Sequence, residues 1–152
     1  MGAWDTGNFV NDAAMDWIGD LRESGTPDTV LTTLRQVTKQ GIPAQPSFVG
    51  KLLGRRPARA YLEAPVASEG LAAAEIVACW LGHPSPKLPE GIMEWIRQNS
   101  GAFTPDLAQT ARQAVTAIKT KSELKDLWEE GDAATAAEWH AVISDLERRL
   151  QS

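Results

Sequence analysis

The chain has 152 residues, of which 43% are hydrophobic, and it carries a formal net charge of -5. This composition is typical of one globular domain and excludes a disordered chain. The excess of acid disfavours nucleic acid and anionic membranes as partners, whereas a basic protein is electrostatically acceptable.

Two helices are expected at the beginning of the chain. Asn11 and Asp12 are good N-cap residues, and apolar residues at helical spacing follow them as far as Gly25. Thr26-Pro27-Asp28 has the pattern of a second helix start, and that helix should end at Gly41. Residues 41–60 are rich in proline and glycine and carry four basic side chains, so we expect a long basic loop there.

The run LAAAEIVACWL, residues 71–81, is apolar except at Glu75. Because a helix that is apolar on every side is normally buried, we expect a buried central helix over residues 68–81, preceded by an extended segment at 61–65 and ended by Gly82. A buried carboxylate needs a donor. Glu75 should therefore meet an arginine, a backbone cap or an indole N–H, for example that of Trp4, Trp17 or Trp80.

The rest of the chain predicts four more helices. A short one is expected at residues 89–99, and Thr104-Pro105-Asp106 should start the next. Ser122 should cap a two-turn helix that reaches Trp128, and Asp132 should cap the last helix. The predicted fold is all-α: a compact single-domain bundle of about seven helices over residues 1–152, with the helix at 68–81 in its centre.

Motifs for metals, nucleotides and nucleophilic catalysis are absent. One cysteine, Cys79, and two histidines, His83 and His140, do not have the spacing of a zinc site, so we expect no metal and no cofactor. Cys79 is interpreted as a core thiol, with a catalytic Cys–His pair as the disfavoured alternative. With no signal peptide, no possible intrachain disulfide and no membrane-spanning run, we expect a cytoplasmic protein.

Three segments resemble a bacterial domain-of-unknown-function family, family 4259. They are the opening MGAWDTGNFVNDAAMDW, the central LAAAEIVACWLG and the later SELKDLWEE. Members of the family typically begin Met-Gly-Ala-Trp-Gly-x-Gly-x-Phe-x-Asn-Asp, and this chain has Asp5 in place of the second glycine. The resemblance covers most of the chain outside residues 41–60. It implies an all-helical bacterial protein and brings no established activity.

Two groups of residues are candidates for function. Trp4 and Phe9 can bury large aromatic surfaces, so the opening residues should pack over the body near Glu75. Asp12, Asp16 and Asp20 are four residues apart and form an acidic row on the first helix. This row, with Trp4, Asn11 and Glu75, is the candidate binding site, although a plain solvated face would have the same pattern.

These features favour a non-enzymatic protein-interaction module, either immunity-like or regulatory, with the acidic row facing a basic protein. The alternative is a small enzyme that uses the carboxylates of Glu75 and Asp12 in a cleft under the N-terminal segment. Contact between nucleic acid and the basic residues of 41–60 is the least favoured hypothesis, because the whole chain is acidic.

Overall fold

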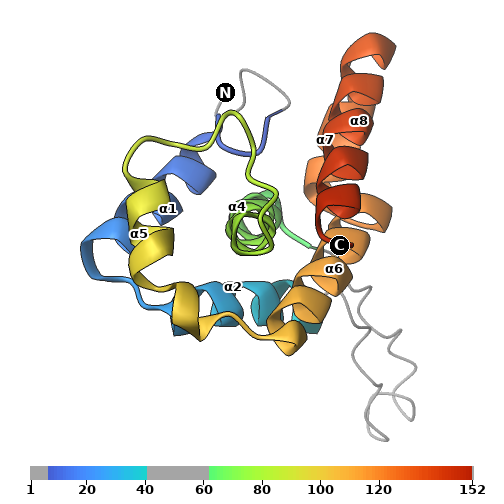
Figure 1. The fold of residues 1–152 in the computed structure, drawn as a ribbon. Helices are drawn as coiled ribbons and strands as arrows, with labels where there is room; N and C mark the ends of the chain where they lie inside the picture. Colours follow the sequence, from blue (N-terminus) through green and yellow to red (C-terminus); the bar gives the residue numbers. More distant parts are fainter. Residues whose placement is uncertain (1–6, 41–61, 152) are drawn as a thin grey trace, which may run out of the picture.

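The structure, a computed structural model, describes residues 7–40 and 62–151. Within these ranges the chain forms α-helices and one short 3-10 helix, η1, and no strand (Figure 1). This confirms the all-α prediction. The helices are α1 (Asp12–Ser24), α2 (Pro27–Gln40), α4 (Ala64–Trp80), α5 (Ile92–Gln98), α6 (Pro105–Thr120), α7 (Glu123–Glu130) and α8 (Ala133–Arg149), and η1 (Ser100–Ala102) follows α5.

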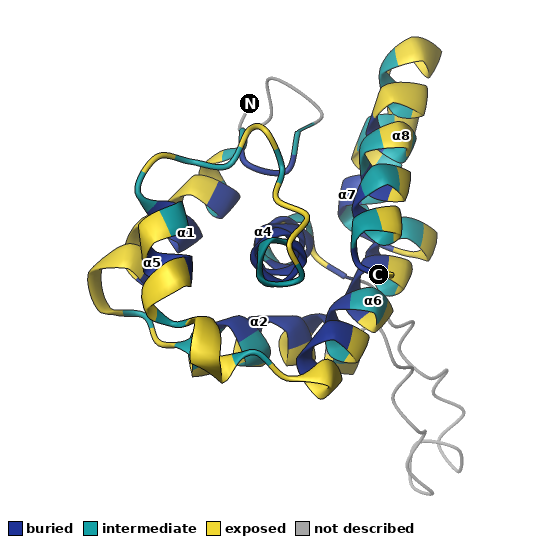
Figure 2. Ribbon diagram, viewed as in Figure 1, coloured by how far each residue is buried: buried dark blue, intermediate teal, exposed yellow. Residues whose placement is uncertain are grey.

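Helix α4 lies at the centre of the bundle, as its sequence predicts. It packs against α1, α2, α5, α6, α7 and α8, which surround it in Figure 1. Figure 2 shows α4 buried along most of its length, while the outer faces of the surrounding helices are exposed. Gly70 permits the close packing of α2, because a Cβ atom at this position would lie 2.5 Å from Cγ2 of Val37.

The start of α4 differs from the prediction. The helix begins at Ala64, four residues before the expected start at residue 68, so residues 64 and 65 are helical instead of extended. Pro65 is compatible with the first turn, because the N–H groups there have no partner within the helix. A carboxylate from α7 supplies the partner: Oε1 of Glu123 accepts a 2.9 Å hydrogen bond from the N–H of Ala64.

Two glycines set the next boundaries. Gly82 has a φ of +93° and follows α4, and the N–H of His83 reaches back to the carbonyl of Ala78 at 2.9 Å. This is the left-handed helix ending expected for glycine. Gly91 has a φ of +84°, so α5 begins only at Ile92, later than the predicted residue 89.

Helix α2 begins at Pro27 as predicted, and four other predicted helix starts are confirmed by their caps. Side-chain oxygens accept hydrogen bonds from backbone N–H groups at the starts of α1, α6, α7 and α8, from the cap residues Asn11, Thr104, Ser122 and Asp132. Helix α7 includes Trp128, as expected, and ends at Glu130, directly before Gly131. The predicted loop at 41–60 and the predicted packing of Trp4 lie outside the described residues.

In the ranges 7–40 and 62–151, none of the helices is long and apolar enough to cross a membrane.

Candidate functional site

Glu75, in the middle of α4, is buried and forms an ion pair with Arg149 from the last turn of α8. Its side chain is 3% exposed. Nη1 of Arg149 donates to Oε2 of Glu75 at 2.8 Å, and Nη2 donates to Oε1 at 2.9 Å. The planar guanidinium thus meets both carboxylate oxygens, which is the strongest geometry for such a pair. Of the donors predicted for Glu75, the structure shows the arginine.

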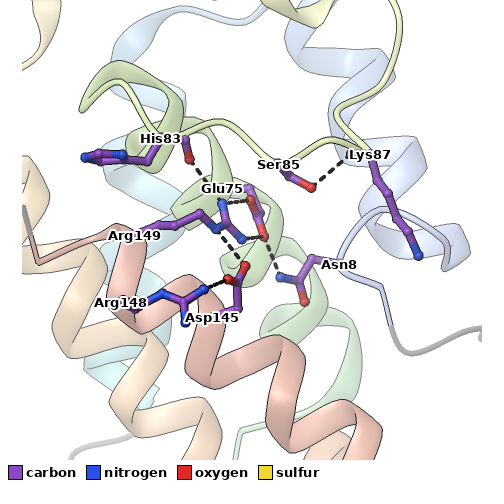
Figure 3. Close-up of polar contacts among 8 residues, drawn as sticks. All are labelled: Asn8, Glu75, His83, Ser85, Lys87, Asp145, Arg148 and Arg149. Atoms are coloured by element: carbon purple, nitrogen blue, oxygen red, sulfur yellow. Dashed lines mark hydrogen bonds and ion pairs between the residues drawn. The ribbon is translucent and has the colours of Figure 1, made fainter.

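Arg149 is held by two further acceptors (Figure 3). Its Nε donates to Oδ2 of Asp145 at 2.8 Å, and Nη1 also reaches the backbone carbonyl of His83 at 3.3 Å. Partial burial lowers the pKa of Arg149, but the hydrogen bonds and charges of Glu75 and Asp145 outweigh it and raise this pKa above its ordinary value. Asp145 also pairs with Arg148. The guanidinium is therefore permanently charged, and all three of its nitrogens donate hydrogen bonds.

Asn8, just before α1, completes the network around Glu75. Its Nδ2 donates to Oε1 of Glu75 at 2.8 Å, so the carboxylate joins the N-terminal segment to α4 and α8 (Figure 3). Because a carboxylate only accepts, the amide must present its nitrogen, and the oxygen faces away. Oδ1 of Asn8 is buried and accepts no hydrogen bond. Phe9 beside it is 5% exposed, so residues 8 and 9 are packed into the body as expected for this segment.

A hollow of about 300 Å³ lies beside this network, between the N-terminal segment, the loop after α4 and α8. Glu75, Asp145 and Arg149 contribute to its wall, together with apolar side chains such as Val10 and Val142. Asp12 does not line this hollow and belongs to a separate groove at the start of α4. Because Glu75 is held by Arg149 and lies apart from Asp12, the geometry gives the enzyme hypothesis no support.

The acidic row of α1 is on the surface. Asp12, Asp16 and Asp20 are all exposed, and their carboxylates form no ion pair with any other described side chain. The row continues toward α4, where burial and the charge of Asp20 raise the pKa of Glu69. Asn11 serves this helix as its N-cap, with Oδ1 2.8 Å from the N–H of Ala14.

The structure therefore separates the predicted site residues into two places. Glu75 lies in the interior, whereas Asp12, Asp16 and Asp20 form a surface row, and Trp4 is outside the described residues. The indoles proposed as donors to Glu75 have other partners: Nε1 of Trp17 donates to Oγ1 of Thr33 at 2.9 Å, and Nε1 of Trp80 donates to the carbonyl of Ile96 at 3.3 Å.

Sequence reasoning missed Asn8 and Asp145 as members of the network around Glu75 and Arg149. The sequence offers no signal for Asn8 beyond its place beside Phe9. Arg149 could have been found from the last helix, because it lies three residues after Leu146 and seven after Val142, at the edge of the apolar stripe.

Cys79 and the possible metal ligands were expected to have no chemical role. Cys79 is partly buried; this burial raises the pKa of its thiol, aided by Glu75 and opposed by Arg97. Its Sγ lies 3.6 Å from Sδ of Met93, which is consistent with a packed core thiol. Over residues 7–40 and 62–151, no group of three or more His, Cys, Asp and Glu side chains is arranged to hold a metal ion.

These features define an all-α single-domain protein with a buried central helix that carries one engaged carboxylate. The chain belongs to the family described as Domain of unknown function (DUF4259), whose model matches residues 2–142. The match includes Asn8, Glu75 and the acidic row, and it ends before Asp145 and Arg149. No curated protein and no solved structure matches the chain.

Proposed function

We propose that this protein is a non-enzymatic interaction module of the regulatory or immunity-like kind, and that the acidic face of α1 binds a basic protein. The observation that carries the proposal is the row of Asp12, Asp16 and Asp20, which is exposed and forms no ion pair with another described side chain.

The spacing of the row has an energetic cost in the free protein. Like charges four residues apart on a helix destabilise it by about 0.2–0.5 kcal/mol per pair, and Asp12 regains part of this at the helix N-terminus. The pKa of Glu69 is raised first by burial and in addition by the negative charge of Asp20. A basic partner would relieve this repulsion, so the feature that weakens the free helix would strengthen a complex.

The experiment compares affinity capture by three forms of the full chain from a lysate of the native organism. They are the wild type, the triple variant Asp12→Asn, Asp16→Asn and Asp20→Asn, and a matched control with Glu90→Gln, Glu130→Gln and Glu138→Gln, which removes three exposed charges elsewhere. Eluting each with increasing salt identifies electrostatic partners, because screening weakens such contacts.

The proposal predicts a basic protein that the wild type and the control retain and release as salt rises, and that the Asp-to-Asn variant does not retain. If all three forms retain the same proteins, the acidic row does not bind a partner and the proposal is wrong. Circular dichroism of each form confirms that the charge changes leave the helices intact.

A further inference from the structure

A second surface feature adjoins the acidic row. It is a groove of about 190 Å³ where the first turns of α1 and α4 meet α7, and it is lined by Asp12, Ala13, Ala64, Pro65, Leu124 and Leu127, among others. Most of these side chains are apolar. The volume is below the roughly 300–1,000 Å³ of pockets for drug-sized ligands, and it is enough for one or two apolar side chains.

Two large hydrophobic side chains are exposed in the described part of the chain, and one of them lines the groove. These are Leu127, 55% exposed at the groove, and Met15, 46% exposed on α1. Met15 follows Asp12 by three residues, so it neighbours the first residue of the row on the helix surface. Single exposed apolar residues are ordinary, but Leu127 lines a groove that also contains Asp12 of the acidic row.

The charge and the spacing of the acidic row indicate what kind of partner would fit the groove. From Asp12 to Asp20 the carboxylates follow α1 at steps of about 6 Å over about 12 Å, which is the spacing of residues i, i+4 and i+8 on another helix. Lysine or arginine at those positions of a partner helix would face the row, and an apolar side chain beside them would enter the groove. Recognition of one amphipathic helix by a groove is a common mode of peptide binding. Nucleic acid would be repelled by the same carboxylates.

We infer that the groove at Leu127 is the anchor site for a basic amphipathic helix of a partner protein, with Asp12, Asp16 and Asp20 pairing along its basic side. This inference rests on the proposed function and adds the class of partner. The charges would set the orientation and the rate of association, whereas the apolar anchor in the groove would slow dissociation.

The test uses two synthetic peptides of about 18 residues, or five helical turns. In the first, lysines are placed at i, i+4 and i+8 beside a leucine stripe; the second has the same composition in an order that is not amphipathic. Fluorescence anisotropy measures their binding to the wild type, to Leu127→Ser, to the triple Asp-to-Asn variant and to the control Glu138→Gln. Because Leu127 is exposed, its replacement should leave the melting temperature nearly unchanged.

The expected result is that the wild type and Glu138→Gln bind the amphipathic peptide more tightly than the shuffled one. Leu127→Ser should weaken this binding by about tenfold, an anchor-sized effect, and leave its salt dependence unchanged, whereas the Asp-to-Asn variant should lose the salt dependence. If Leu127→Ser binds as the wild type does, or both peptides bind equally, the groove is not the anchor, although the acidic row still binds cations. If the Asp-to-Asn variant also matches the wild type, the proposed function fails as well. A dimer in sedimentation that Leu127→Ser disrupts would assign the groove to a second copy and overturn the partner helix.

Discussion

Replacement of Arg149 by methionine should destabilise the protein far more than replacement of its neighbour Arg148. The two arginines are adjacent in the last turn of α8, but their surroundings differ. The side chain of Arg149 is 14% exposed and pairs with buried Glu75, whereas that of Arg148 is 77% exposed and pairs with Asp145. Arg148→Met is therefore a matched control with the same chemical change.

The magnitude follows from what Arg149→Met leaves behind. Glu75, with its side chain 3% exposed, would lose the two hydrogen bonds from the guanidinium and keep the one from Asn8. Breaking a buried ion pair by removing one partner costs about 3–5 kcal/mol. We expect about 3 kcal/mol, the lower end, because the Asn8 bond remains. For a chain of this length this corresponds to a melting temperature about 6–12 °C lower. Arg148→Met should cost less than about 0.5 kcal/mol.

The converse change, Glu75→Met, should cost less than Arg149→Met. Arg149 would still donate to Asp145 and to the carbonyl of His83, and it retains contact with water. Since a buried pair can often be replaced by apolar residues without loss, the double variant should be less destabilised than the sum of the two single variants. The wild type, Glu75→Met, Arg149→Met and the double variant together form a double-mutant cycle.

Urea unfolding followed by tryptophan fluorescence measures these free energies, because the chain has six tryptophans, among them the buried Trp17, Trp95 and Trp139. If Arg149→Met and Arg148→Met lower the free energy of unfolding equally, Glu75 is not sealed from water. If the costs of Glu75→Met and Arg149→Met simply add in the double variant, Glu75 and Arg149 do not stabilise the fold as a pair.

Two further predictions concern helix packing and pH. Gly70→Ala should destabilise the protein by about 1–3 kcal/mol in urea unfolding, because the added Cβ would meet Val37. Gly19→Ala, in open space on α1, should instead stabilise the protein by about 0.5–1 kcal/mol. Equal effects of the two changes would contradict the close packing of α2 on α4. The pKa of Glu69 is raised by burial and by Asp20, so its stabilising contribution is present below the unfolded pKa and is lost as pH rises through the folded one. Glu69→Gln should thus raise the free energy of unfolding at neutral pH by less than about 1 kcal/mol and leave it unchanged near about pH 3. Urea titrations at both pH values measure these free energies. A loss of stability at neutral pH would contradict the expected sign.

The helix starts that could be predicted are those whose signals are local. Asn11 accepts from an N–H three residues later, as do Thr104 and Ser122, so a short window of sequence holds both partners of the hydrogen bond. The burial of α4 was likewise readable, because an apolar residue on every side of a helix requires packing on every side. The exposed acidic row followed from helical spacing alone.

The features that escaped prediction depend on partners far away in the sequence. The start of α4 at Ala64 is stabilised by Glu123, 59 residues later, which accepts a hydrogen bond from the N–H of Ala64. Glu75 selects Arg149, 74 residues away, among several arginines, and that choice depends on where α8 crosses α4. The sequence could predict that Glu75 needed a donor, but only packing could decide which one.

The buried pair also explains how a nearly uniform helix is held in one position. Helix α4 offers apolar surface on all sides, so hydrophobic contact alone distinguishes poorly between alternative rotations and shifts of this helix in the bundle. Rotation or displacement would separate Glu75 from Arg149 and leave a charge buried without its partner, at a cost of several kcal/mol. Asn8 binds the same carboxylate, and α1 begins four residues later with Asn11 as its N-cap. The network around Glu75 therefore connects the core to the segment that leads into α1, the helix whose surface is proposed to bind a partner.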